Sequence, residues 1–196
     1  MRIAGQCFGQ GIAGNSRPRG GVLDAATAAR FEQTALPHLD AAYTLARHLL
    51  RNEQDAEDAV QEAFLRAIRH FDSYRGGDMR AWVLTIVRRA CYTWLRRHRG
   101  ERETTEFDET IHHAPAAAED PESQALHGAL REALAQAIAE LPVEFREIVV
   151  LRDVQGLSYA EIAEVVGIPI GTVMSRLSRA RQRLQRALPI EDYRRN

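Results

Sequence analysis

The sequence predicts an all-α protein made of two small helical domains, which a flexible acidic linker joins. Apolar residues recur every three or four positions through most of the chain, which is the period of amphipathic helices. One proline-containing stretch with many acidic residues and no arginine divides these helices into two groups. The last two helices are separated by a short turn that contains glycine and proline, a pattern typical of a helix-turn-helix.

The composition excludes several classes of protein. With 196 residues, 45% of them hydrophobic, the chain can bury an ordinary core. No apolar run approaches the roughly 20 residues that cross a bilayer, and the N-terminus does not resemble a secretory signal, so we expect a cytoplasmic protein without membrane insertion. Cys7 and Cys91 are far apart and lack companions at metal-ligand spacing. We therefore expect no metal site and no cofactor.

Composition shifts along the chain mark the expected domain boundaries. We expect a glycine-rich disordered tail at 1–24, a first domain at 25–102, an acidic linker at 103–124, a second domain at 125–188 and a short tail at 189–196. From Glu103 to Gly128 there are seven acidic residues and no arginine. The pair His112-His113 lies in this linker without further ligands, so we do not expect it to bind a metal.

The first domain should contain three helical stretches. The first runs from Ala25 to Leu50 and is kinked or split at Pro37. The second runs from about Asp55 to Phe71, and the third from about Met79 to Arg99, after a loop at 72–78. We expect the third helix to supply the core residues Trp82, Val83, Ile86, Ala90 and Leu95.

Charge is segregated within this domain. The start of the second helix is acidic beyond what the helix dipole requires, which is compatible with a protein-docking face. Residues 75–102 hold eight arginines against two acids, interleaved with aromatic residues. Basic and aromatic side chains on one helix favour a surface that follows a nucleic-acid backbone and stacks bases.

The second domain should contain four short helices. We expect buried Leu126, Leu130, Leu134 and Ile138 on the first, and Phe145, Ile148, Val149 and Val154 on the second. Ser158 and Glu161 predict a capped helix that stops at Gly167. The final helix buries Val173, Leu177, Ala180 and Leu184, and it carries five arginines and no acid. Such a helix, presented by a tight turn, suits phosphate contact and major-groove reading of DNA.

Both halves resemble the extracytoplasmic-function sigma factors of bacterial RNA polymerase. The resemblance lies in EDAVQEAFLRAIRHFDSYRGG…MRAWVLTIVRR and LPVEFREIVVLRDVQGLSYAEIAEVVGIPIGTVMSRLSRARQRL, and it covers about Phe31 to Leu188. It implies a transcription initiation factor that binds core RNA polymerase and promoter DNA, and an anti-sigma factor as a further partner. The first domain would dock on the polymerase and melt the downstream promoter element, and the second would read the upstream element.

The resemblance also implies three sets of site residues. The polymerase-binding set is Asp55, Glu57, Asp58, Gln61 and Glu62. The set that binds and melts the downstream element is Ser73, Tyr74, Arg75, Trp82, Arg88, Arg89, Tyr92 and Arg96. The set that binds the upstream element is Thr172, Ser175, Arg176, Ser178, Arg179 and Arg183. The chain departs from the family pattern at Arg89, Thr93 and Met174.

Two other classes of protein are the alternatives. A helix-turn-helix regulator that acts without recruiting polymerase would use residues 157–188 and leave the block at 55–99 without a role. An enzyme would need a convergent set of His, Cys or paired carboxylates, and we find no catalytic residues of this kind.

Overall fold

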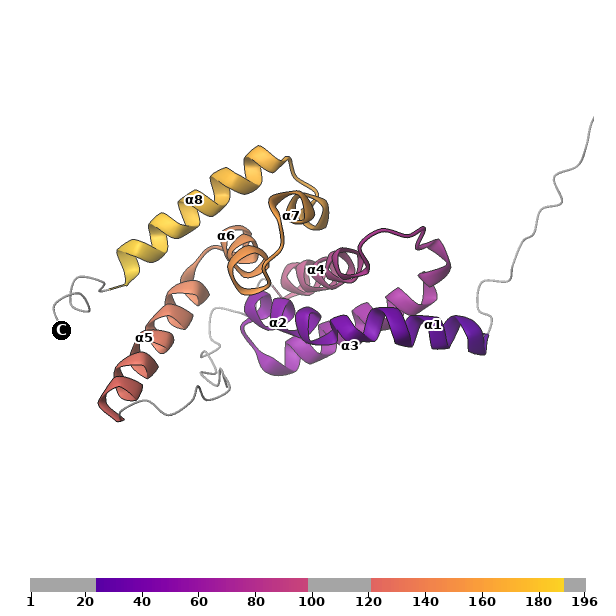
Figure 1. Ribbon diagram of the computed structural model, residues 1–196, viewed down its shortest axis with the longest axis horizontal. Coiled ribbons are helices and arrows are strands. Elements are labelled where there is room, and N and C mark those ends of the chain that lie inside the picture. The colour runs from indigo at the N-terminus through magenta and orange to yellow at the C-terminus, as the bar shows by residue number, and fades with distance from the viewer. Residues whose placement is uncertain (1–23, 99–120, 189–196) are drawn as a thin grey trace, which may run out of the picture.

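The computed structural model describes residues 24–98 and 121–188. The predicted tails, residues 103–120 of the predicted linker, Cys7 and His112-His113 lie outside the described residues. Every regular element in the described ranges is helical, which confirms the all-α class (Figure 1). We call residues 24–98 the first half and residues 121–188 the second half.

The first half follows the predicted order of helices. Its elements are α1 (Ala25–Ala35), the 3-10 turn η1 (Leu36–His38), α2 (Leu39–Leu50), α3 (Glu53–Arg69), the 3-10 turn η2 (Phe71–Ser73) and α4 (Met79–Arg97). Pro37 lies in η1, so the split expected there is confirmed. Asn52 caps α3 by accepting a hydrogen bond from the backbone N–H of Asp55 at 2.9 Å.

The buried face of α4 differs from the predicted one. Val83 and Ala90 are buried as expected, but Trp82, Ile86 and Leu95 are only half-buried. The other buried positions are Ala81, Leu84, Val87 and Cys91. The helix is covered on more than one side, by α2 and α3 of the first half and by α7 of the second, so a single apolar stripe does not describe it.

The second half contains the four predicted helices. They are α5 (Pro121–Glu140), α6 (Val143–Val149), α7 (Tyr159–Val166) and α8 (Ile170–Ala187), with a π-helical segment, η4 (Val150–Val154), after α6. The first of them starts four residues before the expected domain boundary. Leu134 and Val154 were expected to be buried and are exposed instead. Val154 ends the π-helical segment, whose wider turn moves it away from the stripe that the regular period predicts.

The helix-turn-helix forms as its residues predict. Ser158 and Glu161 make a reciprocal capping box at the start of α7. Gly167 ends that helix with φ 74°, a left-handed conformation that glycine adopts without strain. The four predicted core positions of α8 are all buried: Val173, Leu177, Ala180 and Leu184.

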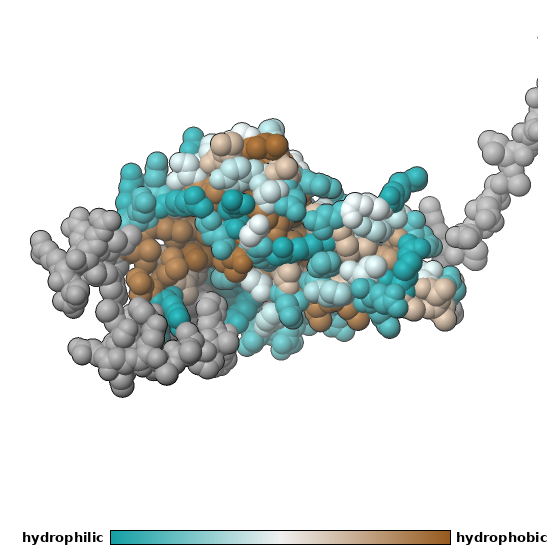
Figure 2. All heavy atoms as spheres, in the orientation of Figure 1, coloured by the Kyte–Doolittle hydropathy of each residue, from teal (hydrophilic) through white to brown (hydrophobic). Residues whose placement is uncertain are grey.

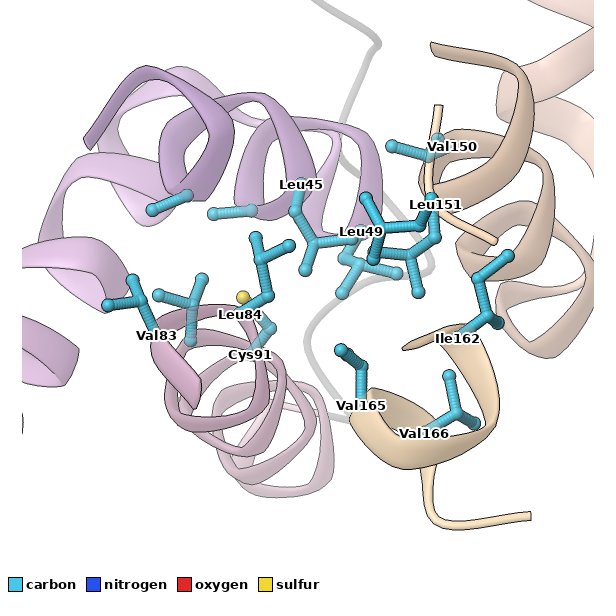
Figure 3. Packing of buried hydrophobic residues seen from close by; sticks show 14 of the residues in the cluster. Leu45, Leu49, Val83, Leu84, Cys91, Val150, Leu151, Ile162, Val165 and Val166 are labelled. Carbon is cyan, nitrogen blue, oxygen red and sulfur yellow. The ribbon is translucent and has the colours of Figure 1, made fainter. Parts of the chain in front are cut away.

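The two halves pack against each other, which the sequence analysis did not predict. Figure 1 shows α4 and α2 lying beside α6 and α7. One hydrophobic cluster runs through both halves, and in Figure 3 Leu49 of α2 lies toward Leu151, with Val165 of α7 close to α4. Gln155 adds polar contacts, since it donates to the carbonyl oxygen of Ala41 at 2.7 Å and its own carbonyl accepts from Arg80 at 2.7 Å.

Over the ranges that the structure describes, none of the helices is both long and apolar enough to span a bilayer.

Candidate nucleic-acid interface

The outward face of α8 is a small polar surface with a positive charge. Ser175, Ser178 and Arg179 are exposed on it, and Thr172 is half-buried at its edge. These residues lie opposite the buried stripe that fixes α8 against α6 and α7. No acidic residue occurs in α8, so a phosphate backbone would meet no repulsion from this helix.

The other two predicted residues of α8 contact α6, although Arg183 is itself exposed. Arg176 is half-buried, and its guanidinium lies 3.7 Å from the carboxylate of Glu147. The guanidinium of Arg183 lies over the ring of Phe145, 5.0 Å from its centroid. The structure thus separates the six predicted residues into an outward group and two arginines that contact α6.

Two exposed apolar side chains lie at the start of α8, and of these only Met174 was noted in the sequence, as a departure from the family pattern. Ile170 and Met174 are 47% and 52% exposed, and they are one turn apart. Figure 2 shows the brown patch at this end of the otherwise hydrophilic helix. The signal in the sequence was an apolar residue outside the buried stripe, next to Ser175.

The loop before α4 brings a second group of predicted residues together. Tyr74 donates a hydrogen bond to the carbonyl oxygen of Gly77 at 2.6 Å, and its ring lies 5.4 Å from that of Trp82. Ser73 and Arg75 are exposed beside it. Gly76 and Gly77 have φ 94° and 104°, a conformation that lets the loop turn tightly around Tyr74. The result is an aromatic wall with polar side chains at its rim.

The basic residues of α4 are divided between two sides of the helix. Arg89 and Arg96 are exposed, and with Trp82 they recur every seven residues along one side. Arg88 and Tyr92 are one turn apart on the side that faces the second half. Only the exposed side is available to a nucleic acid in this arrangement of the chain.

Arg88 and Arg176 converge on one buried carboxylate, and we call this group, with Tyr92, the Glu147 junction. Glu147 is fully buried on α6. Arg88 donates to it from Nε at 2.7 Å and from Nη2 at 3.3 Å, a bidentate pair. The same guanidinium lies 4.4 Å from the centroid of the Tyr92 ring. The junction therefore ties together α4, α6 and α8.

The Glu147 junction shifts the pKa of the Tyr92 phenol. Burial, and then the negative charge of Glu147, raise the pKa of Tyr92 above its ordinary value of 10.0. For the guanidinium of Arg88, burial acts to lower the pKa, but the hydrogen bond and the charge of Glu147 outweigh it and raise the pKa. The junction thus favours a neutral phenol and a charged guanidinium.

The predicted docking residues lie on α3. Glu57, Asp58, Gln61 and Glu62 are exposed, and Asp55 is half-buried near the capped start of the helix. Glu62 forms an ion pair with Arg66 one turn later. Leu65 lies on the same face, 50% exposed, and the sequence analysis missed it. Leu65 is seven residues from Asp58, a spacing that places both residues on the same face of a helix, and this was the signal in the sequence.

Comparison with known proteins agrees with this geometry. The family model described as Sigma-70 region 2 matches residues 35–101, and that described as Sigma-70, region 4 matches residues 131–184. The ECF RNA polymerase sigma factor SigE of Mycolicibacterium smegmatis is 36% identical over 162 residues, which are 83% of this chain and 63% of that protein. SigM of Mycobacterium tuberculosis is 38% identical over 162 residues, 81% of this chain and 76% of that protein.

Solved structures show the same fold. The sigma factor RpoE of Bartonella quintana, in complex with the anti-sigma factor NepR, superposes with a TM-score of 0.66 at 31% identity, over 81% of this chain and 96% of that one. CnrH, in complex with the cytosolic domain of CnrY, superposes with a TM-score of 0.55 at 25% identity, over 83% and 94%.

The two matched regions define a sigma-70-type transcription factor, a class without enzymatic activity of its own. Within that class, the chain belongs to the extracytoplasmic-function sigma factors. The family expected from the sequence is confirmed.

We expect the Glu147 junction to make Tyr92 the last tyrosine to ionise. Because the folded state raises the pKa of this phenol, its stabilisation is complete below about pH 10 and is lost as the pH rises through the folded pKa. The free energy of unfolding should then fall by up to about 1.4 kcal/mol per pH unit from this group. Tyr92→Phe should remove the last step of a tyrosinate absorbance titration and flatten this alkaline loss.

Tyr43→Phe is the matched control, because the Tyr43 hydroxyl donates to Glu53, away from the junction. It should leave the last titration step in place. An unchanged titration curve in Tyr92→Phe would contradict the description of the junction.

Proposed function

We propose that the chain recruits core RNA polymerase to specific promoters, reads the upstream promoter element with α8 and melts the downstream element with the surface of α4 and its preceding loop. The single observation that carries the proposal is the outward face of α8, which presents Ser175, Ser178 and Arg179 from a rigid helix-turn-helix. Family membership adds promoter-directed initiation with polymerase as the general activity.

The upstream element would be read as duplex DNA. A helix fits the major groove, where guanidinium groups pair with guanine and hydroxyl groups pair with several bases. Arg179 is the exposed guanidinium nearest the serines of the turn-proximal half of α8. Arg176 is half-buried beside Glu147, so in this arrangement it contributes positive potential beside the groove rather than base contacts. Arg183 is exposed, with its guanidinium over the ring of Phe145.

The downstream element would be captured as unpaired bases. Aromatic faces stack with bases of any kind, and each stack is worth about 1–3 kcal/mol, enough to offset a few kcal/mol of unpairing. Tyr74 and Trp82 supply such faces, and Ser73 and Arg75 lie at their rim. Arg89 and Arg96 continue the positive charge along α4.

Polymerase would dock on α3. Acidic residues precede the exposed Leu65 on α3 and Arg69 follows it one turn later, and an apolar side chain within a charged rim is the usual composition of a protein interface. Since both structural neighbours with matching folds are complexes, one of them with a protein named as an anti-sigma factor, we also propose an anti-sigma factor as a partner. A regulator that never recruits polymerase would have no use for the first half.

The direct test is in vitro transcription with core polymerase on a library in which both promoter elements are randomised. The proposal expects transcripts from a subset that shares two short sequence elements. Specific binding of duplex DNA with no dependence of transcription on this chain would favour the regulator that acts without polymerase.

Replacing Arg179 should change both affinity and sequence preference. A bidentate contact to a base is worth about 1–3 kcal/mol, so Arg179→Ala should weaken binding to the selected upstream element by this amount and relax the preference at one position. Arg186→Ala removes the same charge from the far end of α8 and should leave the preference intact. A selection experiment that returns the same sequence for Arg179→Ala and wild type would limit Arg179 to phosphate contact.

Reversing one charge on α3 should weaken polymerase binding. We expect Asp58→Arg to lower the amount of core polymerase that co-purifies with the chain, because it opposes the charge of the docking face. Glu164→Arg makes the same change in net charge on the exposed side of α7 and is the control. Equal recovery of polymerase with both variants, at unchanged circular dichroism, would show that Asp58 is a solvated residue that does not contact polymerase.

A further inference from the structure

The Glu147 junction joins the two halves through a charge that water does not reach. Glu147 belongs to the second half and is fully buried, whereas Arg88 belongs to the first half and is 59 residues away in the sequence. The side chain of Arg88 is 19% exposed. This buried carboxylate is strongly oriented, because it loses Arg88, one of its two guanidinium partners, if the halves move apart.

The residues held by this junction are those of the downstream-element surface. Arg88 and Tyr92 are one turn apart on α4, the helix that also carries Trp82, Arg89 and Arg96. A carboxylate and a phosphate accept the same bidentate hydrogen bonds from a guanidinium. Glu147 therefore occupies the donors that a DNA phosphate would take, and the guanidinium that it holds lies over the Tyr92 ring on which a base would stack.

The remaining contacts between the halves join α7 to α4 and α6 to α2. Gln155 bridges α4 and α2 through hydrogen bonds to Arg80 and Ala41, and apolar side chains meet around Leu49 and Leu151 (Figure 3). Connections of this kind allow the halves to separate without unfolding, because each keeps its own buried helices. Breaking the buried ion pair by removing one partner is costly, because it leaves a buried charge without compensation.

We propose that Glu147 is an autoinhibitory latch that holds the free protein closed and withholds Arg88 and Tyr92 from single-stranded DNA. Separation of the halves exposes the guanidinium and the ring together, and Glu147 keeps Arg176 as its partner. The inference rests on the proposed role of α4 in binding unpaired bases. If only a fraction of the molecules is open, the apparent dissociation constant for single-stranded DNA exceeds the intrinsic one by the inverse of that fraction.

The test uses the full chain and three variants. Glu147→Gln keeps the shape of the side chain and removes its charge. Arg88→Gln breaks the same pair while leaving the whole second half unchanged. Asp153→Asn is the matched control, because Asp153 pairs with Arg181 of α8 at 2.5 Å within the second half. Circular dichroism reports whether each variant retains its helices.

Two readouts separate the latch from the proposed function. Small-angle X-ray scattering gives the radius of gyration, and fluorescence anisotropy gives the affinity for fluorescein-labelled oligo(dT). We expect a larger radius for Glu147→Gln and Arg88→Gln, and the wild-type radius for Asp153→Asn. We expect Glu147→Gln to bind oligo(dT) about tenfold more tightly if one molecule in ten is open in the wild type. Arg88→Gln opens without this gain, since it lacks the guanidinium.

Wild-type radii for both Glu147→Gln and Arg88→Gln, with helices retained, would overturn the latch. If Glu147→Gln unfolds, the radius of gyration of Arg88→Gln alone tests the latch. An enlarged radius of Glu147→Gln without tighter oligo(dT) binding would overturn the occlusion of a DNA surface and the proposed role of Arg88 and Tyr92, while leaving closure of the free protein intact.

Discussion

A single buried carboxylate constrains how the helices of this protein are arranged. Moving a carboxylate out of water costs several kcal/mol, so the full burial of Glu147 depends on the guanidinium groups that reach it. Arg88 approaches from α4 and Arg176 from α8, which fixes both helices relative to α6. An apolar cluster also runs through both halves.

This constraint explains why the arginines of the chain have different roles. On α8, the stripe of buried residues and the contact with Glu147 turn Arg176 inward, and the opposite face is left to Ser175, Ser178 and Arg179. On α4, the same carboxylate draws Arg88 toward the second half while Arg89 remains exposed. Of these two neighbours in the sequence, Arg88 thus faces the second half and Arg89 faces solvent. Only arginines that face solvent can meet DNA without a rearrangement of the helices.

Sequence reasoning succeeded where the determinants are local. The capping box of Ser158, the left-handed Gly167 and the apolar stripe of α8 each depend on residues within a few positions, and the structure has them as predicted. It failed on α4, where burial depends on helices from both halves, and at Val154, where a π-helical turn interrupts the regular period. Glu147 gave no local signal, because its partner Arg88 is distant in the sequence. Leu65 did give a local signal in the sequence, because it is an apolar residue on the same helix face as acidic residues.

The central claim is that the charge pair between Glu147 and Arg88 holds the halves together, and a double-mutant cycle measures it most directly. The free energies of unfolding of wild type, Glu147→Gln, Arg88→Gln and the double variant give the coupling between the two side chains. For a buried bidentate pair we predict a coupling of about 1.5 kcal/mol or more, above the 0.2–1 kcal/mol or so typical of exposed pairs. Effects that add within about 0.5 kcal/mol would contradict the account.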